Sequence, residues 1–324
     1  MTVGGPLRPV VAVAVVSWNT RELLARCLRS LEHDVDRGVA EVHVLDNASR
    51  DGSAAMVRAE FPWARLIESS ENIGFGRAVN LIAEATDTPW LAISNADVAL
   101  RPGALAQLIA AGKADPAAGI VAPRLILPDG ATQHSVFAFP TVPFTAVLNS
   151  GLFHLSRDWS DRLALRGFWN AERPRRVPWA VGAFLLARRS AWDAVGGFDP
   201  RQWMSAEDLD LGWRMHQAGW CTRYEPSAVV DHHHSAATGQ VWGDELPIHW
   251  QRCAYAWMLR RRGRARTSAV GVMNFLGSGL RYFALWPLAL VWPARFHEQW
   301  RRLGPWTLVH AYALAPRRTL ERYI

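Results

Sequence analysis

Short apolar runs alternate with amphipathic stretches along the first two thirds of the chain. The valine-rich run Val10–Val16 ends in the turn-like Ser17-Trp18-Asn19, which predicts a buried first strand. The run is too short for a secretory signal and lacks a small-residue cleavage site. The pattern then predicts helices over Arg21–Leu31, near Ser53–Glu60 and over Arg77–Ala85, and strands over Glu41–Leu45, Arg65–Ile67 and Trp90–Ile93. This alternation is typical of an α/β fold with a mainly parallel sheet flanked by helices.

The regular alternation stops at the turn Pro128-Asp129-Gly130. From there to Pro178 the chain is irregular and rich in arginine, and we expect an inserted, partly helical cover instead of a new domain. Later segments predict a strand over Trp179–Arg188, a helix over Ala206–Ala218, and strands near Thr222–Tyr224 and Ala228–Val230. We therefore place a catalytic domain at residues 1–240.

The remaining residues, 241–324, differ in charge and in pattern. From Arg252 to the end there are 13 basic and 2 acidic residues, against 23 and 27 before it, within a net charge of +7. Trp250–Arg266 predicts a basic helix. The apolar stretch that follows is interrupted by Arg281, Pro287 and Pro293, so it does not predict a clean transmembrane helix. Such a basic region indicates an anionic partner.

We expect this C-terminal region to attach to a membrane surface without spanning it. The residues expected at headgroup depth are Trp286, Trp292, Trp300 and Trp306, beside Arg260, Arg261, Arg262, Arg264 and Arg266. A helical subdomain that packs onto the catalytic body is the alternative. The three cysteines form no CxxC pair, which fits a reducing compartment. The expected location is the cytoplasmic face of the plasma membrane, peripheral or monotopic, and no recognition fold indicates a nucleic-acid partner.

Polar residues follow several of the predicted strands, where an α/β sheet forms its ligand crevice. Asp46-Asn47 could accept a hydrogen bond from a base N–H or a ribose hydroxyl, or could only shape a turn. Asn72 to Asn80 is a glycine-containing loop that opens a helix, with Gly74 near a ligand and Arg77 available to a phosphate. It lacks the third glycine of a dinucleotide fingerprint, and no glycine-rich turn follows the first strand, so an NAD-dependent oxidoreductase is disfavoured.

Two motifs carry groups suited to a cation and to proton transfer. Asn95-Ala96-Asp97 follows an apolar strand, where a carboxylate could hold a cation on a diphosphate or cap a turn. His232 ends another predicted strand, and imidazole beside a carboxylate suits Mn²⁺ better than Mg²⁺. Ser205 to Asp208 resembles a capping box, but a capping box needs one acidic side chain and this segment has two, Glu207 and Asp208. We favour Asp208 as a general base for an acceptor hydroxyl.

Taken in order, these motifs resemble inverting glycosyltransferases of family 2 with the GT-A fold, in the bacterial rhamnosyltransferase-like branch known from actinobacterial cell-wall linker synthesis. The resemblance covers about Val11 to Gly239. Its motifs are Val15 to Asn19, Leu45 to Ser53, Asn72 to Gly76, Asn95 to Asp97, Gly196 to Asp199, Glu207 to Leu211 and His232. It implies a Rossmann-like catalytic domain that transfers a sugar from a nucleotide with inversion of configuration.

The resemblance also implies the roles of single residues. The nucleotide-sugar would be held by Ser17, Trp18, Asn19, Asp46, Asn47, Asn72, Gly74, Arg77, Asn95 and Ala96. Asp97 and His232 would hold Mn²⁺ or Mg²⁺, and Asp208 with Glu207 would form the catalytic pair. Asn95 stands where the family often has a first aspartate, which bears on metal dependence.

The implied reaction moves rhamnose from dTDP-rhamnose onto a lipid-linked saccharide in cell-wall or surface polysaccharide synthesis. Two alternatives stay open: another donor such as a UDP-sugar, or a non-catalytic nucleotide-sugar-binding protein of the same fold. A binding protein needs no base, and the presence of Glu207 and Asp208 argues against it.

Overall fold

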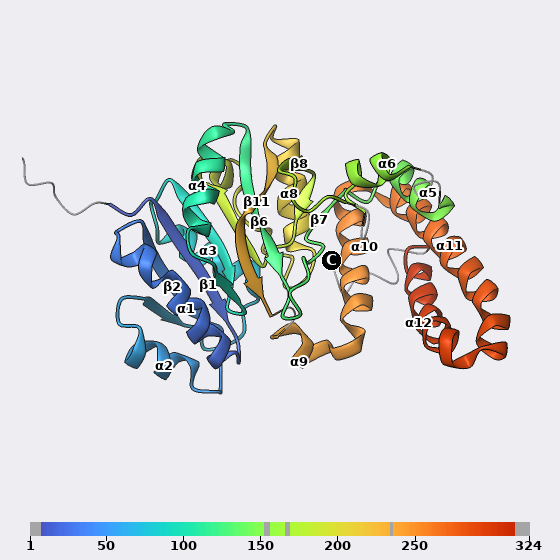
Figure 1. The fold of residues 1–324 in the computed structure, drawn as a ribbon, viewed down its shortest axis with the longest axis horizontal. Helices are drawn as coiled ribbons and strands as arrows, with labels where there is room; N and C mark the ends of the chain where they lie inside the picture. Colours follow the sequence, from blue (N-terminus) through green and yellow to red (C-terminus); the bar gives the residue numbers. More distant parts are fainter. Residues whose placement is uncertain (1–7, 152–155, 166–168, 234–235, 315–324) are drawn as a thin grey trace, which may run out of the picture. The chain divides into compact units, whose positions relative to one another are not determined.

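The computed structural model describes residues 8–151, 156–165, 169–233 and 236–314. The chain forms two compact units. The first contains residues 1–137 and 170–241, and the second contains residues 138–169 and 242–324. Each unit is described by itself below (Figure 1).

A mixed sheet of nine strands forms the centre of the first unit, in the order β3-β2-β1-β4-β10-β6-β11-β5, with β8 paired to β11. The strands are β1 Val11–Ser17, β2 Ala40–Asp46, β3 Arg65–Glu68, β4 Trp90–Asn95, β5 Val98–Leu100, β6 Ala118–Ile126, β8 Arg175–Val177, β10 Phe184–Arg188 and β11 Cys221–His232. Neighbours among β3, β2, β1 and β4 pair in parallel, as do β6 and β11, whereas β10 runs antiparallel between β4 and β6. The mainly parallel sheet expected from the sequence is confirmed.

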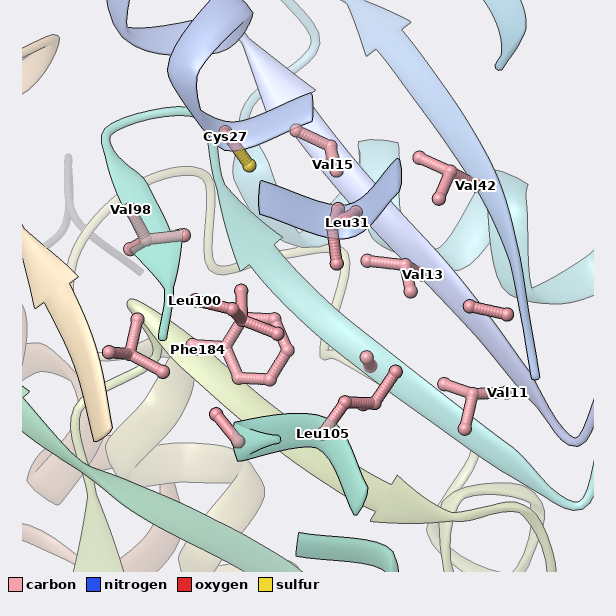
Figure 2. Packing of buried hydrophobic residues seen from close by; sticks show 14 of the residues in the cluster. Val11, Val13, Val15, Cys27, Leu31, Val42, Val98, Leu100, Leu105 and Phe184 are labelled. Carbon is pink, nitrogen blue, oxygen red and sulfur yellow. The ribbon is translucent and has the colours of Figure 1, made fainter. Parts of the chain in front are cut away.

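Helices cover the sheet on both faces. A buried cluster joins alternate residues of β1, Val11, Val13 and Val15, to α1 Arg21–Asp36, α2 Ser53–Glu60 and α4 Ala104–Ala114. Figure 2 shows Cys27 and Leu31 of α1 and Leu105 of α4 pointing into this cluster. Successive side chains of a strand point to opposite faces, and α3 Phe75–Glu84 packs on β1 and β2 outside the cluster. Helices α7 Arg189–Val195 and α8 Glu207–Gln217 complete the unit.

Two strand predictions were wrong in detail. The single strand expected at Trp179–Arg188 is broken at residues 181–183: β9 Trp179–Ala180 pairs with β7 Val136–Phe137 in a separate two-stranded sheet, and β10 joins the main sheet. Apolar residues continue through the break, so the pattern could not reveal it. The two strands expected at 222–230 are one strand, β11, whose pairing register with β6 shifts between Glu225 and Val229. Pro226 lies in this irregular stretch, where a missing N–H is tolerated.

The second unit is helical. It contains α5 Val142–Ser150, α6 Arg157–Arg162, α10 Leu246–Arg262, α11 Arg264–Val291 and α12 Pro293–Ala311, preceded by α9 Thr238–Trp242 and a 3-10 turn, Gly243–Glu245. Residues 138–169, expected as a cover of the catalytic part, pack here: α5 lies against α11, and Asn149 Nδ2 donates to Asn274 Oδ1 at 2.9 Å. No helix among the described residues is long and apolar enough to cross a membrane.

Candidate active site

The carboxyl ends of three neighbouring strands bring several candidate residues together. The pairing registers place Ser17 of β1 beside Asp46 of β2, and Val16 of β1 beside Asn95 of β4. Trp18 follows β1 and is half-buried. The end of the sheet that the sequence singles out is thus one continuous polar edge, and the backbone N–H of Asn47 donates to Ser17 O at 2.8 Å across it.

Asp46 lies at this edge and uses one of its two carboxylate oxygens in a hydrogen bond. Its Oδ2 accepts from the N–H of Ser49 at 3.0 Å, which fixes the side chain within the turn. Its Oδ1 is buried and has no hydrogen-bond partner among the described residues. A buried, unsatisfied carboxylate oxygen costs free energy, so a donor from a ligand would stabilise it. Asp46 therefore shapes the turn and can also receive a ligand N–H or O–H.

Asn47 connects this edge to the glycine-containing loop. Its Oδ1 accepts from the Ile73 N–H and its Nδ2 donates to Asn72 Oδ1, both at 2.8 Å. Asn72 Oδ1 also accepts from the N–H of Gly74 at 3.0 Å. On the other side, Asn19 Oδ1 accepts from the Arg50 N–H at 2.7 Å. Asn19, Asn47 and Asn72 are therefore scaffold groups that hold three loops around Asp46.

The loop after Asn72 is covered by another segment of the chain. Gly74 has φ of 84°, and a Cβ there would lie 2.4 Å from the carbonyl oxygen of Trp203. Only glycine fits such a backbone and such an approach. Arg77 Nε donates to the carbonyl of Pro200 at 3.0 Å, so its guanidinium holds the loop before α8. This bond uses Nε, and the rest of the exposed guanidinium is available to the phosphate contact expected from the sequence.

Asp97 and His232 lie together because β5 and β11 pair antiparallel, with Val98 opposite His232. Ala96 and Asp97 form the buried turn between β4 and β5. His232 Nε2 lies 3.4 Å from Asp97 Oδ1, and Asp97 Oδ2 accepts from the Ala236 N–H at 3.2 Å. Burial acts to raise the pKa of Asp97, but the contact with His232 and the Ala236 N–H hold that pKa below its usual value.

These two side chains fit a divalent cation. Asp97 Oδ1 is buried and makes no hydrogen bond with the described residues, while a carboxylate and an imidazole form a donor set suited to Mn²⁺. The described part of the chain contains no group of three or more His, Cys, Asp and Glu side chains that could hold a metal. A cation held here would thus take its remaining ligands from a bound diphosphate or from water.

Glu207 and Asp208 begin α8 after a strained turn. Ser205 and Ala206 have φ of 71° and 64°, values that side chains with a Cβ rarely adopt and that cluster at functional sites. Ala206 is the N-cap, and no side chain among the described residues caps this helix, so the capping box suggested by the sequence does not form. Asp208 instead accepts from the Gly182 N–H with Oδ2 at 3.1 Å and from its neighbour Leu209 with Oδ1 at 2.8 Å.

The two carboxyl groups differ in their protonation. Burial raises the pKa of Asp208 to about 6, although the Gly182 and Leu209 N–H groups oppose the rise. Burial, and then the charge of Asp208, raise the pKa of Glu207 to about 8. Both pKa values are raised, so near neutral pH the two neighbouring carboxyl groups share one proton, and the two N–H groups that donate to Asp208 favour the negative charge there. A charged carboxylate with a raised pKa is suited to accept a proton at this pH.

A short turn joins the base to the polar edge. The Asn95 N–H at the end of β4 donates to Ala183 O at 2.9 Å, and the adjacent residue, Gly182, donates to Asp208. A bound nucleotide, a cation and a base could thus act on one substrate. Sequence reasoning did not single out Gln133, whose Oε1 lies 2.6 Å from His232 Nδ1, because one glutamine after a turn carries no recognisable pattern.

Comparison with known proteins shows which family has this arrangement. Residues 12–139 match the family model described as Glycosyl transferase family 2. The chain is 34% identical over 279 residues, 78% of its length and 89% of the relative's, to the N-acetylglucosaminyl-diphospho-decaprenol L-rhamnosyltransferase of Mycobacterium tuberculosis.

Solved structures share the fold. A mannosyltransferase from Pyrobaculum calidifontis, in complex with GDP-Man and Mn²⁺, aligns with a TM-score of 0.58 and 18% identity over 95% of this chain and 87% of that one. GalNAc-T7 with UDP, GalNAc and Mn²⁺ aligns with a TM-score of 0.53 and 15% identity over 75% of this chain and 50% of that one. With the rhamnosyltransferase similarity extending over most of both chains, this protein is a glycosyltransferase and belongs to glycosyltransferase family 2.

Proposed function

We propose that the protein transfers a hexose, with inversion of configuration, from a nucleotide-sugar to a lipid-linked saccharide acceptor, in the synthesis of a cell wall or surface polysaccharide. The observation that carries the proposal is that two groups of side chains are connected through the turn at residues 181–183. Asp97 with His232 is suited to a cation, and Asp208 is a buried carboxyl group that accepts two backbone N–H bonds. The M. tuberculosis relative is named for transfer of L-rhamnose to a decaprenol-linked N-acetylglucosamine, which supports rhamnose and a polyprenyl-diphosphate acceptor.

In this mechanism Asp208 takes the proton from the acceptor hydroxyl as its oxygen attacks the anomeric carbon, on the face opposite the departing diphosphate. The Gly182 and Leu209 N–H groups hold the Asp208 carboxylate in a fixed orientation for that transfer. Burial and the charge of Asp208 raise the pKa of Glu207, and in its protonated form Glu207 can donate a hydrogen bond to a substrate oxygen. A divalent cation, Mn²⁺ or Mg²⁺, held by Asp97 and His232 would neutralise the charge that develops on the leaving diphosphate.

The proposed donor is dTDP-rhamnose, with a UDP-sugar as the alternative. Thymine and uracil both present a ring N–H, and Asp46 Oδ1 is the buried acceptor without a partner among the described residues at the polar edge. Because the two bases share this group, Asp46 would bind either nucleotide. The experiment that tests the function is transfer by purified protein from a panel of dTDP- and UDP-sugars to a polyprenyl-diphosphate amino-sugar, with either cation present.

Asp46→Asn is expected to weaken binding of dTDP and UDP by about 10- to 100-fold, because a hydrogen bond to a charged group contributes about 1.5–3 kcal/mol. Titration calorimetry with each nucleotide measures the effect. Asp87→Asn is the matched control, since Asp87 is exposed in the loop before β4. Equal nucleotide affinity in wild type and Asp46→Asn would contradict the role of Asp46.

For the helical unit we propose attachment to the cytoplasmic face of a membrane, which would bring a lipid-linked acceptor to the enzyme. A stripe of exposed apolar side chains runs along α11 at intervals of three or four residues. The stripe consists of Val272, Leu276, Leu280, Phe283, Trp286 and Leu290, which are 42% to 72% exposed. Residues spaced in this way lie on one face of a helix.

Charge favours an anionic lipid surface as the occupant of this stripe. On α11 and α12 the exposed basic residues are Arg264, Arg266, Arg281, Arg295, Arg301 and Arg302. The described residues of these two helices contain one acidic side chain, Glu298, which pairs with Arg301 and Arg302. An apolar stripe flanked by arginines is typical of a helix that lies in the membrane interface. Among the tryptophans expected at headgroup depth, Trp286 and Trp292 are more than half exposed.

The double variant Leu280→Ser, Phe283→Ser is expected to lower partition into vesicles with anionic lipid by at least about tenfold, because each buried CH₂ contributes about 0.8 kcal/mol. Sedimentation with vesicles at low and high salt measures the partition. Leu81→Ser is the control, since Leu81 is a 47% exposed side chain on α3 of the first unit. Wild-type protein that stays in solution with anionic vesicles at low salt would contradict the membrane proposal.

A further inference from the structure

A buried glutamine contacts His232 on the side away from Asp97. Gln133 follows the turn after β6, and its backbone is fixed: its N–H donates to Leu125 O at 2.9 Å, and the preceding Thr132 forms an antiparallel bridge with Ile126. Its side chain is 8% exposed, and its Oε1 lies 2.6 Å from His232 Nδ1. The contact joins positions 99 residues apart in the chain, and both partners are buried.

The chemistry of this contact selects one form of the imidazole. A carboxamide oxygen only accepts, so the nitrogen facing it, Nδ1, must carry a proton. In a neutral imidazole the other nitrogen, Nε2, then presents its lone pair. Nε2 lies on the side of Asp97, 3.4 Å from Oδ1. Without a cation, a proton on Nε2 can bridge the two atoms, which is how His232 lowers the pKa of Asp97. In the neutral ring with its proton on Nδ1, a cation takes that place between the two electron-rich atoms.

We infer that Gln133 is a positioning residue that holds His232 in the Nδ1-protonated form, so that Nε2 and Asp97 Oδ1 together bind a divalent cation. The inference rests on the proposed function for the identity of the site, and it adds to that function a residue outside the motifs of the family resemblance. Histidines that bind metals commonly donate their other N–H to an oxygen acceptor, which fixes the ring and strengthens the ligand.

The same segment also reaches the base. Two residues after Gln133, Ser135 O accepts from the Val181 N–H at 2.8 Å, and β7 pairs with β9 just beyond. Residue 182, next in the chain, donates to Asp208. The segment from Gln133 to Phe137 thus contacts the proposed cation ligand at one end, and through its pairing with residues 179–181 it adjoins the turn that supports the proposed base. A substitution at Gln133 acts on the contact with the cation ligand and leaves the backbone pairing in place.

Binding of Mn²⁺ in the presence of dTDP tests the inference without any turnover. Gln133→Leu removes the acceptor at similar size and is expected to raise the Kd for Mn²⁺ by about 10- to 100-fold, followed by electron paramagnetic resonance. Gln133→Glu keeps an oxygen acceptor and is expected to restore Mn²⁺ binding to within a few fold of wild type. Gln107→Leu, at an exposed position on α4, is the control.

Nitrogen NMR of the His232 ring gives a second readout, the nitrogen that carries the proton. If Gln133 only supported the fold, its substitution would not change this readout. Wild type with Mg²⁺ and dTDP is expected to show a proton on Nδ1 and none on Nε2, and Gln133→Leu is expected to lose this preference. A ring protonated on Nε2 in wild type, or an unchanged Mn²⁺ Kd in Gln133→Leu, would overturn the inference. If Gln133→Leu does not fold, the wild-type spectrum and Gln133→Glu still decide it.

The outcomes separate this inference from the proposed function. A protein that binds Mn²⁺ in a Gln133-dependent way but transfers no sugar would refute the function and keep the inference. A protein that transfers sugar with the same Mn²⁺ affinity in wild type and Gln133→Leu would keep the function and refute the inference.

Discussion

Asp208→Asn is expected to lower kcat by about 10²–10⁴-fold while the affinity for the donor nucleotide stays within about twofold. The amide keeps the size of the side chain and can still accept from the Gly182 N–H, but it cannot take a proton from the acceptor. Single-turnover transfer from the donor identified by the panel gives kcat, and calorimetry gives the nucleotide affinity. Asp193→Asn, at an exposed position on α7, is the matched control.

The pH profile of transfer extends this prediction. Burial raises the pKa of Asp208 to about 6, so the base is charged above that pH and protonated below it. The rate is therefore expected to fall about tenfold for each pH unit below pH 6, because only the charged form accepts the proton. Donor binding with unchanged transfer in Asp208→Asn would remove the general base from the mechanism. Donor binding without transfer in wild type would favour the non-catalytic binding protein.

Asp97→Asn is expected to lower kcat/KM by about 10²–10³-fold and to abolish the response of the rate to added Mn²⁺. The substitution keeps the shape of the side chain and an oxygen for the Ala236 N–H, but it removes the negative charge beside His232 Nε2. Transfer rates measured over a Mn²⁺ titration give both quantities.

Asp231→Asn serves as the control for Asp97→Asn. Asp231 lies on the same strand as His232, but its partner is Arg101 in an exposed ion pair, which contributes little to stability. Its rate is expected to stay within about twofold of wild type. If Asp97→Asn and wild type were equally active in a chelator, the cation would have no part in transfer.

The sequence predicted the polar edge well because strand ends are marked by local pattern. Apolar runs end at Ser17, Asp46 and Asn95, and parallel neighbours in a sheet align such ends. The strands β1, β2 and β4 and the helices α1, α2 and α3 therefore begin close to their predicted starts, whereas α4 was not predicted.

The remaining features depend on contacts between distant segments, which leave no periodic signal. The proposed role of Gln133 depends on its contact with His232, 99 residues later in the chain. The break at residues 181–183 arises because one flank pairs with β7 and the other with β4 and β6. The hydrogen bond from Arg77 to the Pro200 carbonyl, 123 residues later, likewise has no local signal in the sequence.

The helical unit is assembled from two separate stretches of the chain, and this has a consequence for synthesis on the ribosome. Residues 138–169 emerge long before residues 242–324, so α5 must wait for α11 before its packing partner exists. The first unit, by contrast, has all of its strands once residue 232 has been made. A fragment ending near residue 241 would carry α5 without α11, and a shorter enzyme for expression would have to delete residues 138–169 as well.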